Sequence, residues 1–289
     1  MPIKKYIPLV LKQHARELQK QVKLINARHY CPVCESRVDA FLPLPEFFSE
    51  NQQKYGFPFE TKDAETCNEA AYLCPACGAS DRDRLYALFL GDYIANLEIP
   101  AQIVDFAPSE PLSTFIRRLI KSSGKDIHYR TADLLAENVD DQVDISDLGS
   151  YESDQFNFFI CSHVLEHVPD DRKALRELHR ILRPGGKGIL MVPIILGLAQ
   201  IDEDPEVEDE AERWRRFGQF DHVRLYSKSG FLERVREAGF DVCELGKEFF
   251  GEDMFKQTGI TSQSVLYIVE SPKAAGHESQ EKERRRREI

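Results

Sequence analysis

The stretch from Phe156 to Pro193, FNFFICSHVLEHVPDDRKALRELHRILRPGGKGILMVP, predicts a βαβ unit. Phe156 to Cys161 is an apolar run of the length of a buried strand, and Gly188 to Val192 is a second one. Between them, Asp170 or Asp171 suits the cap of a helix, and an Arg-Pro-Gly-Gly turn predicts its end. The apolar residues of this helix recur at helical spacing, and they are Ala174, Leu175, Leu178, Ile181 and Leu182.

Polar side chains gather directly after the first of these strands, and they are Ser162, His163, Glu166 and His167. Open parallel sheets bind their ligands at the carboxyl ends of the strands. The stretch therefore predicts both the fold class and the place of a functional site.

The composition limits the class of protein. The chain has 289 residues, 42% of them hydrophobic, which suffices for one large domain or for a medium domain with an appended module. Its formal net charge of −11 argues against a protein whose main work is to bind phosphate backbones. The sequence shows neither a long apolar run nor an export signal, so we expect a cytoplasmic protein without a membrane span.

Two cysteine pairs share one spacing, Cys31-Pro-Val-Cys34 and Cys74-Pro-Ala-Cys77. Two cysteines on a tight turn present both sulfur atoms to one ion, and two such pairs complete the tetrahedral thiolate site that suits Zn²⁺. The alternative, four unrelated reduced thiols, does not explain the repeated pattern. Four ligands leave no open position, so we expect a structural zinc ion, with residues 35–73 forming an inserted arm.

Three further cysteines remain of the seven. Cys67 lies near Cys74 in the sequence and could be mistaken for a zinc ligand, but it is outside the repeated pattern. Cys161 and Cys243 fall in predicted strands, so we expect both to be small buried apolar residues. The odd number of cysteines argues against a disulfide framework.

From Ala101 onward strands and helices alternate, which predicts a doubly wound, mostly parallel α/β sheet of seven strands. Apolar spacing predicts a helix over residues 9–27, and Ser80 suits the cap of a helix that runs to about Leu97. We therefore expect an N-terminal helix in residues 1–28, a zinc ribbon with an inserted arm in 29–79, a linker helix in 80–100, the sheet domain in 101–271 and a disordered charged tail in 272–289.

Carboxylates follow successive predicted strands at Asp105, Asp133 and Asp144. In this position they suit the hydroxyls of a ribose and the amino group of an adenine. The turn after the first strand, Ala107–Pro111, contains no glycine, so it does not match the glycine-rich turn that holds a pyrophosphate. Because Glu110 would also repel a phosphate, the pattern favours a cationic ligand without one.

These residues resemble a known family. From about residue 101 to 270 the chain is similar to class I S-adenosylmethionine-dependent methyltransferases, and the two cysteine pairs make it resemble the bacterial members with an N-terminal zinc ribbon. The matching segments are Asp105–Pro108, Cys161–Val168, Leu178–Gly186, Phe217–Arg224 and Ala238–Phe240. The resemblance implies the class I methyltransferase fold, with S-adenosyl-L-methionine and structural zinc as bound groups.

The resemblance also implies site residues. The methionine part of the cofactor would be held by Asp105, Phe106, Ala107, Pro108 and Glu110, the ribose by Asp133, the adenine by Asp144 and Ile145, and the sulfonium by Ser162 and His163. Two departures from the family pattern stand out. Ala107, Ser109 and Pro111 replace glycines that most of the superfamily has, and Asn157 replaces an Asp that commonly follows Phe in the fourth strand.

The implied reaction is the attack of a substrate oxygen or nitrogen on the methyl group of the cofactor. The sulfonium already activates this methyl group, so the protein mainly positions the reactants and excludes water. An oxygen acceptor must also lose a proton, for which His163, His167 and His222 are candidate bases. We favour His222, because it lies in the insertion that usually shapes the acceptor pocket. Ordinary hydrogen-bonded imidazoles are the alternative.

The sequence His163-x-x-Glu166-His167 leaves a second metal site open. Some metal-dependent O-methyltransferases place Glu-x-x-Glu-His here and bind a divalent ion that orients the hydroxyl. Together with His222 these residues would form a reasonable ligand set, against a purely structural use of the Glu-His pair. The zinc-peptidase pattern H-x-x-E-H also matches, but it requires a helix, whereas these residues follow a strand.

The acidic run from Asp202 to Glu212, followed by arginines, predicts a helix or lid over the site. An acidic lid disfavours anionic polymers, so we expect a small molecule or a sugar as the methyl acceptor. One alternative is a nucleic-acid methyltransferase guided by the zinc ribbon, which would bind in a salt-sensitive way. Another is a non-catalytic interaction protein that has kept the fold, for which the glycine-free turn is the argument.

Overall fold

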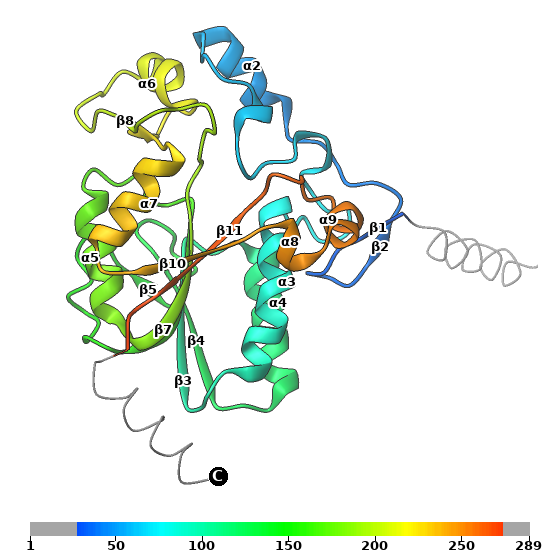
Figure 1. The fold of residues 1–289 in the computed structure, drawn as a ribbon, viewed down its shortest axis with the longest axis vertical. Helices are drawn as coiled ribbons and strands as arrows, with labels where there is room; N and C mark the ends of the chain where they lie inside the picture. The colour runs from blue at the N-terminus through cyan, green and yellow to red at the C-terminus, as the bar shows by residue number, and fades with distance from the viewer. Residues whose placement is uncertain (1–27, 274–289) are drawn as a thin grey trace, which may run out of the picture.

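The computed structural model describes residues 28–273 (Figure 1). The helix expected over residues 9–27 and the tail beyond residue 273 lie outside this range. Within the described range, no helix has the length and apolar content needed to cross a membrane.

Short strands and a helix precede a regular alternation of strands and helices. In chain order the elements are β1 (His29–Tyr30), β2 (Arg37–Val38), α2 (Glu46–Tyr55), two 3₁₀ turns (Thr61–Asp63 and Glu69–Ala71), α3 (Asp81–Asn96), β3 (Ala101–Phe106), α4 (Glu110–Ser123), β4 (Ile127–Asp133), β5 (Asp141–Gln142), β6 (Phe156–Ser162), α5 (Asp171–Ile181), β7 (Leu182–Met191), β8 (Asp202–Glu203), α6 (Glu210–Phe217), β9 (Arg224–Leu225), α7 (Lys228–Glu237), β10 (Asp241–Leu245), α8 (Lys247–Phe250), α9 (Glu252–Thr258) and β11 (Leu266–Glu270).

One seven-stranded sheet organises the described chain, in the order β10-β11-β7-β6-β3-β4-β5. The five strands from β7 to β5 run parallel, whereas β11 lies antiparallel to both β7 and β10. The predicted fold class, a mostly parallel seven-stranded α/β sheet of the class I methyltransferase type, is confirmed. The parallel order places the carboxyl ends of β3, β4 and β6 along one edge.

Helices cover both faces of this sheet, α3 and α4 on one side and α5 and α7 on the other (Figure 1). The strands are buried from both sides, as the fully buried rings of Phe156, Phe158 and Phe159 on β6 show. The ring of Tyr93 on α3 lies 4.4 Å from that of Phe158. Helix α3, expected as a linker, is therefore packed as part of the helical layer.

Strand β7 differs from the prediction at its start. The expected turn over Arg183–Gly186 is already part of the strand, which begins at Leu182 directly after α5. Gly185 N–H donates to Ser271 O at 2.8 Å and Ser271 N–H donates to Gly186 O at 3.0 Å, but Gly185 has a left-handed φ of 76° and the register of β7 with β6 shifts between Leu182 and Lys187. The turn signal thus marks the end of α5 and persists as an irregularity within the strand.

The burial expected of the two strand cysteines is right for one of them. Cys161 in the central strand β6 is fully buried, whereas Cys243 in β10 is exposed. Strand β10 is the edge of the sheet, and a side chain there has a neighbouring strand on one side alone. The expectation for Cys243 was therefore wrong, because the sequence does not show the strand order.

The segment between the two cysteine pairs reaches over the sheet domain. Its helix α2 packs against the lid helix α6, where the ring of Tyr55 stacks on Trp214 at 6.2 Å between centroids. Further along, Glu65 N–H donates to Ile194 O at 2.9 Å, and the Glu65 carboxylate accepts from Tyr267 at 2.7 Å. The arm, residues 35–73, is thus anchored on both the lid and the end of the sheet.

Candidate active site

A cavity of about 320 Å³ lies where the arm, the lid and the polar end of β6 meet. The arm contributes mainly apolar and aromatic side chains, such as Leu44, Phe48 and Phe57, and the lid contributes Phe217. The polar residues His163, Glu166, His167 and His222 form one part of the wall. The predicted lid and the predicted catalytic histidines therefore border the same cavity.

Glu166, His167 and His222 present their ligand atoms to one point. One oxygen or nitrogen atom of each lies within 4.8 Å of the others. The rings of His167 and His222 meet edge to face at 4.8 Å between centroids. The side chain of Glu166 is fully buried, and neither of its carboxylate oxygens has a hydrogen-bond partner in the described chain.

Neighbouring oxygen atoms fix the two imidazoles in the form that a metal requires. His222 Nδ1 lies 3.2 Å from the carbonyl oxygen of Phe217, and His167 Nδ1 lies 3.3 Å from that of Asp221. A carbonyl oxygen only accepts, so in the neutral form of each ring Nδ1 carries the hydrogen and Nε2 keeps its lone pair. The carboxylate of Asp221, at 3.3 Å, adds a second acceptor for His167 Nδ1.

His163 approaches the same carboxylate, with Nδ1 3.2 Å from Glu166 Oε1. Burial acts to raise the pKa of Glu166, but the contact with His163 and the other imidazoles outweighs it and holds this pKa at about 2. Burial, and then the charge of Arg82, lowers the pKa of His163 to about 4. At neutral pH the site therefore combines a carboxylate with a neutral His163.

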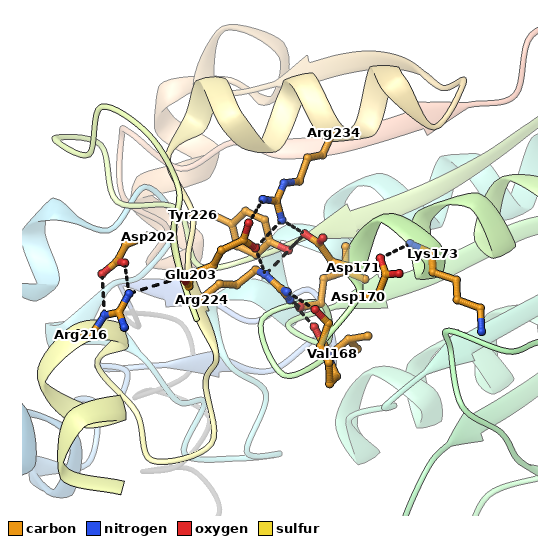
Figure 2. A network of polar contacts seen from close by, with 12 residues as sticks. Val168, Asp170, Asp171, Lys173, Asp202, Glu203, Arg216, Arg224, Tyr226 and Arg234 are labelled. Carbon is orange, nitrogen blue, oxygen red and sulfur yellow. Dashed lines mark hydrogen bonds and ion pairs between the residues drawn. The ribbon is translucent and has the colours of Figure 1, made fainter. Parts of the chain in front are cut away.

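Arg224 holds the loop that carries Glu166 and His167 (Figure 2). Its guanidinium donates to the carbonyl oxygens of Leu165, Val168 and Pro169, and to the carboxylate of Glu203. The backbone adds to this, since Val223 N–H donates to Glu166 O at 2.9 Å. The loop after β6 and the segment with His222 are thus fixed to one another.

The same ionic network extends into the two helices behind the loop (Figure 2). The buried Asp171, at the start of α5, accepts from Arg234 at 2.6 Å and from Tyr226 at 2.5 Å. Arg234 also pairs with Glu203 in β8 at 2.5 Å. Every buried charge in this network has a partner of opposite sign.

The turn expected to hold the cofactor follows β3. Asp105 is buried and accepts a hydrogen bond from Tyr129 at 2.6 Å. Burial raises the pKa of Asp105 to about 7, although the bond from Tyr129 opposes this. Ala107 has a φ of 51°, the left-handed conformation that glycine adopts more easily. The backbone of this turn therefore keeps a glycine-type conformation without the glycine.

The other predicted cofactor residues lie at the neighbouring strand ends. Phe106 ends β3, Pro108 follows, and Glu110 opens α4. Asp133 ends β4, and its carboxylate accepts from Leu135 N–H and Ala136 N–H. Asp144 is exposed and accepts from Ser146, and Ile145 beside it is buried. Ser162 bonds Tyr86 of α3 at 2.7 Å. Of all these residues, His163 alone also lines the cavity.

The unexpected Asn157 has a clear partner, since its side-chain oxygen accepts from Gln102 N–H at 2.9 Å. An aspartate would supply the same kind of acceptor. The replacement therefore keeps the bond that joins the starts of β6 and β3.

The four predicted zinc ligands lie together. Cys31 Sγ is 3.9 Å from Cys77 Sγ, and Cys34 Sγ is 3.9 Å from Cys74 Sγ. A tetrahedral zinc ion with Zn–S bonds of about 2.3 Å separates its sulfur atoms by roughly 3.8 Å. The thiols fit such an ion, and Cys67 lies instead in the cavity wall.

Sequence reasoning missed several residues of the site. Asp221 supports His167, Asp83 of α3 accepts from Ser109 of the cofactor turn at 2.8 Å, and Arg82 lines the cavity. For Asp221 the sequence offers one signal, because this residue directly precedes the candidate base His222. Nothing local indicates that the first turn of α3 lies beside the ends of β3 and β6.

Comparison with known proteins agrees with this geometry. The methyltransferase domain family matches residues 93–245, so the chain belongs to this family. The enzyme class that the sequence predicted, a methyltransferase, is thereby confirmed.

Among curated proteins, the chain is 34% identical over 65 residues to the ubiquinone biosynthesis O-methyltransferase of Pseudomonas syringae pv. tomato. The matched stretch covers 22% of this chain and 23% of that protein. It is 29% identical over 98 residues to the protein of the same name in Xanthomonas axonopodis pv. citri, 34% of this chain and 36% of that one. The matches thus span well under half of these relatives.

Among solved structures, the citrinin polyketide synthase CMeT domain has a TM-score of 0.45 at 14% identity and covers 80% of this chain and 58% of that one. The [4+2]-cyclase SpnF has a TM-score of 0.40 at 15% identity and covers 66% of this chain and 84% of that one.

Proposed function

We propose that this protein transfers the methyl group of S-adenosyl-L-methionine to a hydroxyl oxygen of a small molecule or sugar that binds in the cavity beside His163. The observation that carries this proposal is the buried carboxylate of Glu166, which has His163 Nδ1 beside one oxygen at 3.2 Å, no hydrogen bond to the other oxygen in the described chain, and two further imidazoles within reach. A neutral imidazole does not balance the charge of a buried carboxylate, and leaving that charge uncompensated is costly, so a bound cation explains its place.

The cofactor would lie along the ends of β3, β4 and β6. Asp105 and the turn through Glu110 would hold its methionine part, Asp133 its ribose, Asp144 and Ile145 its adenine, and Ser162 and His163 its sulfonium end. The left-handed Ala107 supports this assignment, because the turn keeps the backbone form that a close approach of a ligand needs. The cofactor supplies a methyl group that is already activated by its positive sulfur.

A divalent ion would be held by Glu166, His167 and His222. The donor set of one carboxylate and two neutral imidazoles suits ions such as Mn²⁺, Fe²⁺ or Zn²⁺ and leaves open positions. Such an ion would bind an acceptor hydroxyl and lower its pKa. In this arrangement His222 orients the acceptor rather than acting as its base, and His163, which does not complete the ligand triad, is the remaining candidate for the proton.

The four cysteines would hold a second metal, a structural zinc ion of the zinc-ribbon type. Their spacing and their sulfur–sulfur distances support this. The proposed role is to fix both ends of the arm, because the two pairs flank it in sequence.

Calorimetry with S-adenosylhomocysteine and then with Mn²⁺ tests both parts of the proposal. We expect the folded protein to bind each of them, and Glu166→Gln to weaken Mn²⁺ binding at least about tenfold without changing the affinity for S-adenosylhomocysteine. Glu233→Gln, at an exposed position on α7, is the matched control. Absence of S-adenosylhomocysteine binding would exclude the methyltransferase function, whereas equal Mn²⁺ binding by both variants would exclude the metal site alone.

A further inference from the structure

Arg82, in the first turn of α3, lies in the wall of the cavity with most of its hydrogen-bond donors free. Its Nη2 donates to the hydroxyl of Tyr72 at 2.8 Å, and no carboxylate of residues 28–273 lies within ion-pair distance of it. A guanidinium carries five N–H donors. This one therefore has no direct ion-pair partner among the described residues, and it keeps several free donors beside the cavity. Burial acts to lower its pKa, but nearby groups, Asp81 and Asp83 among them, raise this pKa overall.

The nearest acids along the helix are already engaged. The carboxylate of Asp81 accepts from Asn68 N–H at 2.5 Å, and that of Asp83 accepts from Ser80 and Ser109. Arg84, which lies on the same helix as Arg82, has its donors occupied. Its guanidinium donates to five backbone carbonyl oxygens outside the helix. Arg84 is thus a structural cation, whereas Arg82 has no comparable role.

The remainder of the cavity wall shows what kind of molecule would reach Arg82. Within the described chain, Arg82 is the sole lysine or arginine among the lining residues, and aromatic and aliphatic side chains make up much of the remainder. Glu166 and the imidazoles form one polar part of the wall, and the other polar lining residues include Gln52, Glu60, Thr61, Thr66 and Gln219. Of these, Glu60 is exposed and is paired with Lys62. A molecule with an apolar body fits this wall if it carries an acidic group for Arg82 and a hydroxyl group for the side with Glu166 and the imidazoles.

We propose that Arg82 binds a carboxylate of the methyl acceptor, so that the acceptor is a hydroxy acid with an apolar or aromatic body. This inference rests on the proposed function and names its substrate class. A guanidinium pairs with a carboxylate through two parallel hydrogen bonds, which gives both affinity and orientation. The acceptor is thereby held at one end by Arg82, while its hydroxyl faces Glu166 and His222.

A carboxylate also occurs in the methionine part of the cofactor, and the lining of the cavity favours the acceptor. Of the residues assigned to the cofactor, His163 alone borders the cavity that Arg82 borders, while the arm and the lid supply much of the wall. The two sources are separated by saturating the protein with S-adenosylhomocysteine before the acceptor probe is added.

Benzoate and benzyl alcohol are suitable probes, because they share an aromatic body and differ in charge. Calorimetry on the full chain saturated with S-adenosylhomocysteine should show that benzoate binds at least about tenfold more tightly than benzyl alcohol. Arg82→Gln should abolish this difference, and Arg82→Lys should restore part of it. Arg215→Gln, an exposed lid arginine paired with Glu212, is the control and should change nothing.

Three results would overturn the inference. They are equal binding of the two probes by the unmodified protein, an unchanged preference in Arg82→Gln, and a tenfold or greater loss of S-adenosylhomocysteine affinity in Arg82→Gln, which would assign the charge to the cofactor. Circular dichroism melting verifies that each variant is folded. Since binding of S-adenosylhomocysteine is measured separately, a failure here is distinct from a failure of the proposed methyl transfer.

Discussion

The guanidinium of Arg224 donates to the carbonyl oxygen of Leu165 at 2.5 Å, one residue before Glu166. Arg224 itself follows His222 by two residues. A single buried side chain thus fixes the distance between two segments that lie more than fifty residues apart in sequence and that carry the proposed metal ligands. Arg224 is therefore a positioning residue, because its loss would change the relative positions of Glu166 and His222 although it contacts neither side chain.

Replacing Arg224 should therefore impair both stability and metal binding. Arg224→Ala would leave three carbonyl oxygens without their donor and Glu203 with Arg234 alone, and we expect a loss of about 3–5 kcal/mol in the free energy of unfolding, measured in urea. Arg224→Lys keeps the charge and should remain folded, but with Mn²⁺ affinity reduced about tenfold. Arg215→Ala, at an exposed pair, should cost under about 1 kcal/mol. Wild-type Mn²⁺ affinity in a folded Arg224→Lys variant would contradict the positioning role.

Asp105 should make the stability depend on pH. Because burial raises its pKa in the folded protein to about 7, the folded state favours the protonated form, and its stability falls as the pH rises from about 4 to 7. Asp105→Asn removes this cost, so the stability of the variant relative to the unmodified protein should increase by about 3 kcal/mol between pH 5 and pH 8. Urea unfolding at the two pH values measures the difference. A gap that does not change with pH would show that Asp105 is ionised throughout.

The turn after β3 should tolerate the glycine that it lacks. Ala107 is exposed and left-handed, so Ala107→Gly relieves a steric cost of about 1 kcal/mol that offsets the added freedom of the unfolded chain. We expect an unchanged or slightly higher melting temperature. Ala95→Gly, at an exposed position in α3, should instead destabilise the protein by about 0.5–1 kcal/mol. Equal losses for the two variants would argue against strain at Ala107.

Removal of one thiol should release the proposed structural zinc ion. Cys74→Ser replaces a buried ligand, and we expect the zinc content after dialysis to fall by about one ion per chain, with a lower melting temperature. Cys243→Ser, at the exposed edge strand, should leave both quantities unchanged. Elemental analysis by mass spectrometry gives the metal content. A full complement of zinc in Cys74→Ser would disprove the four-cysteine site.

Much of the sheet domain was predictable because its signals are local. Ser80 and Ser227 each cap the helix that follows them, and the apolar run at Phe156 forms the central strand. The histidines after this strand were placed correctly at its carboxyl end, because parallel strands carry their polar ends to one edge. Such features depend on neighbours within a few residues, which the sequence displays directly.

The parts that escaped prediction depend on distant contacts. The exposure of Cys243 follows from the order of the strands, and the place of Arg82 follows from the packing of α3 against the sheet. The sequence of the arm has no recognisable apolar periodicity, so it did not indicate that Phe48 and Phe57 would line the cavity. Contacts between segments more than a hundred residues apart leave no local pattern from which they could be read.

The arm between the two cysteine pairs also bears on how such a protein can change its substrate. Much of the cavity wall proposed for the acceptor comes from this arm, whereas the proposed cofactor residues lie at or just beyond the strand ends of the sheet. Substitutions in the arm can accumulate without disturbing strand pairing or the cofactor turn. Selection can therefore vary which molecule is methylated while the apparatus that delivers the methyl group is inherited intact.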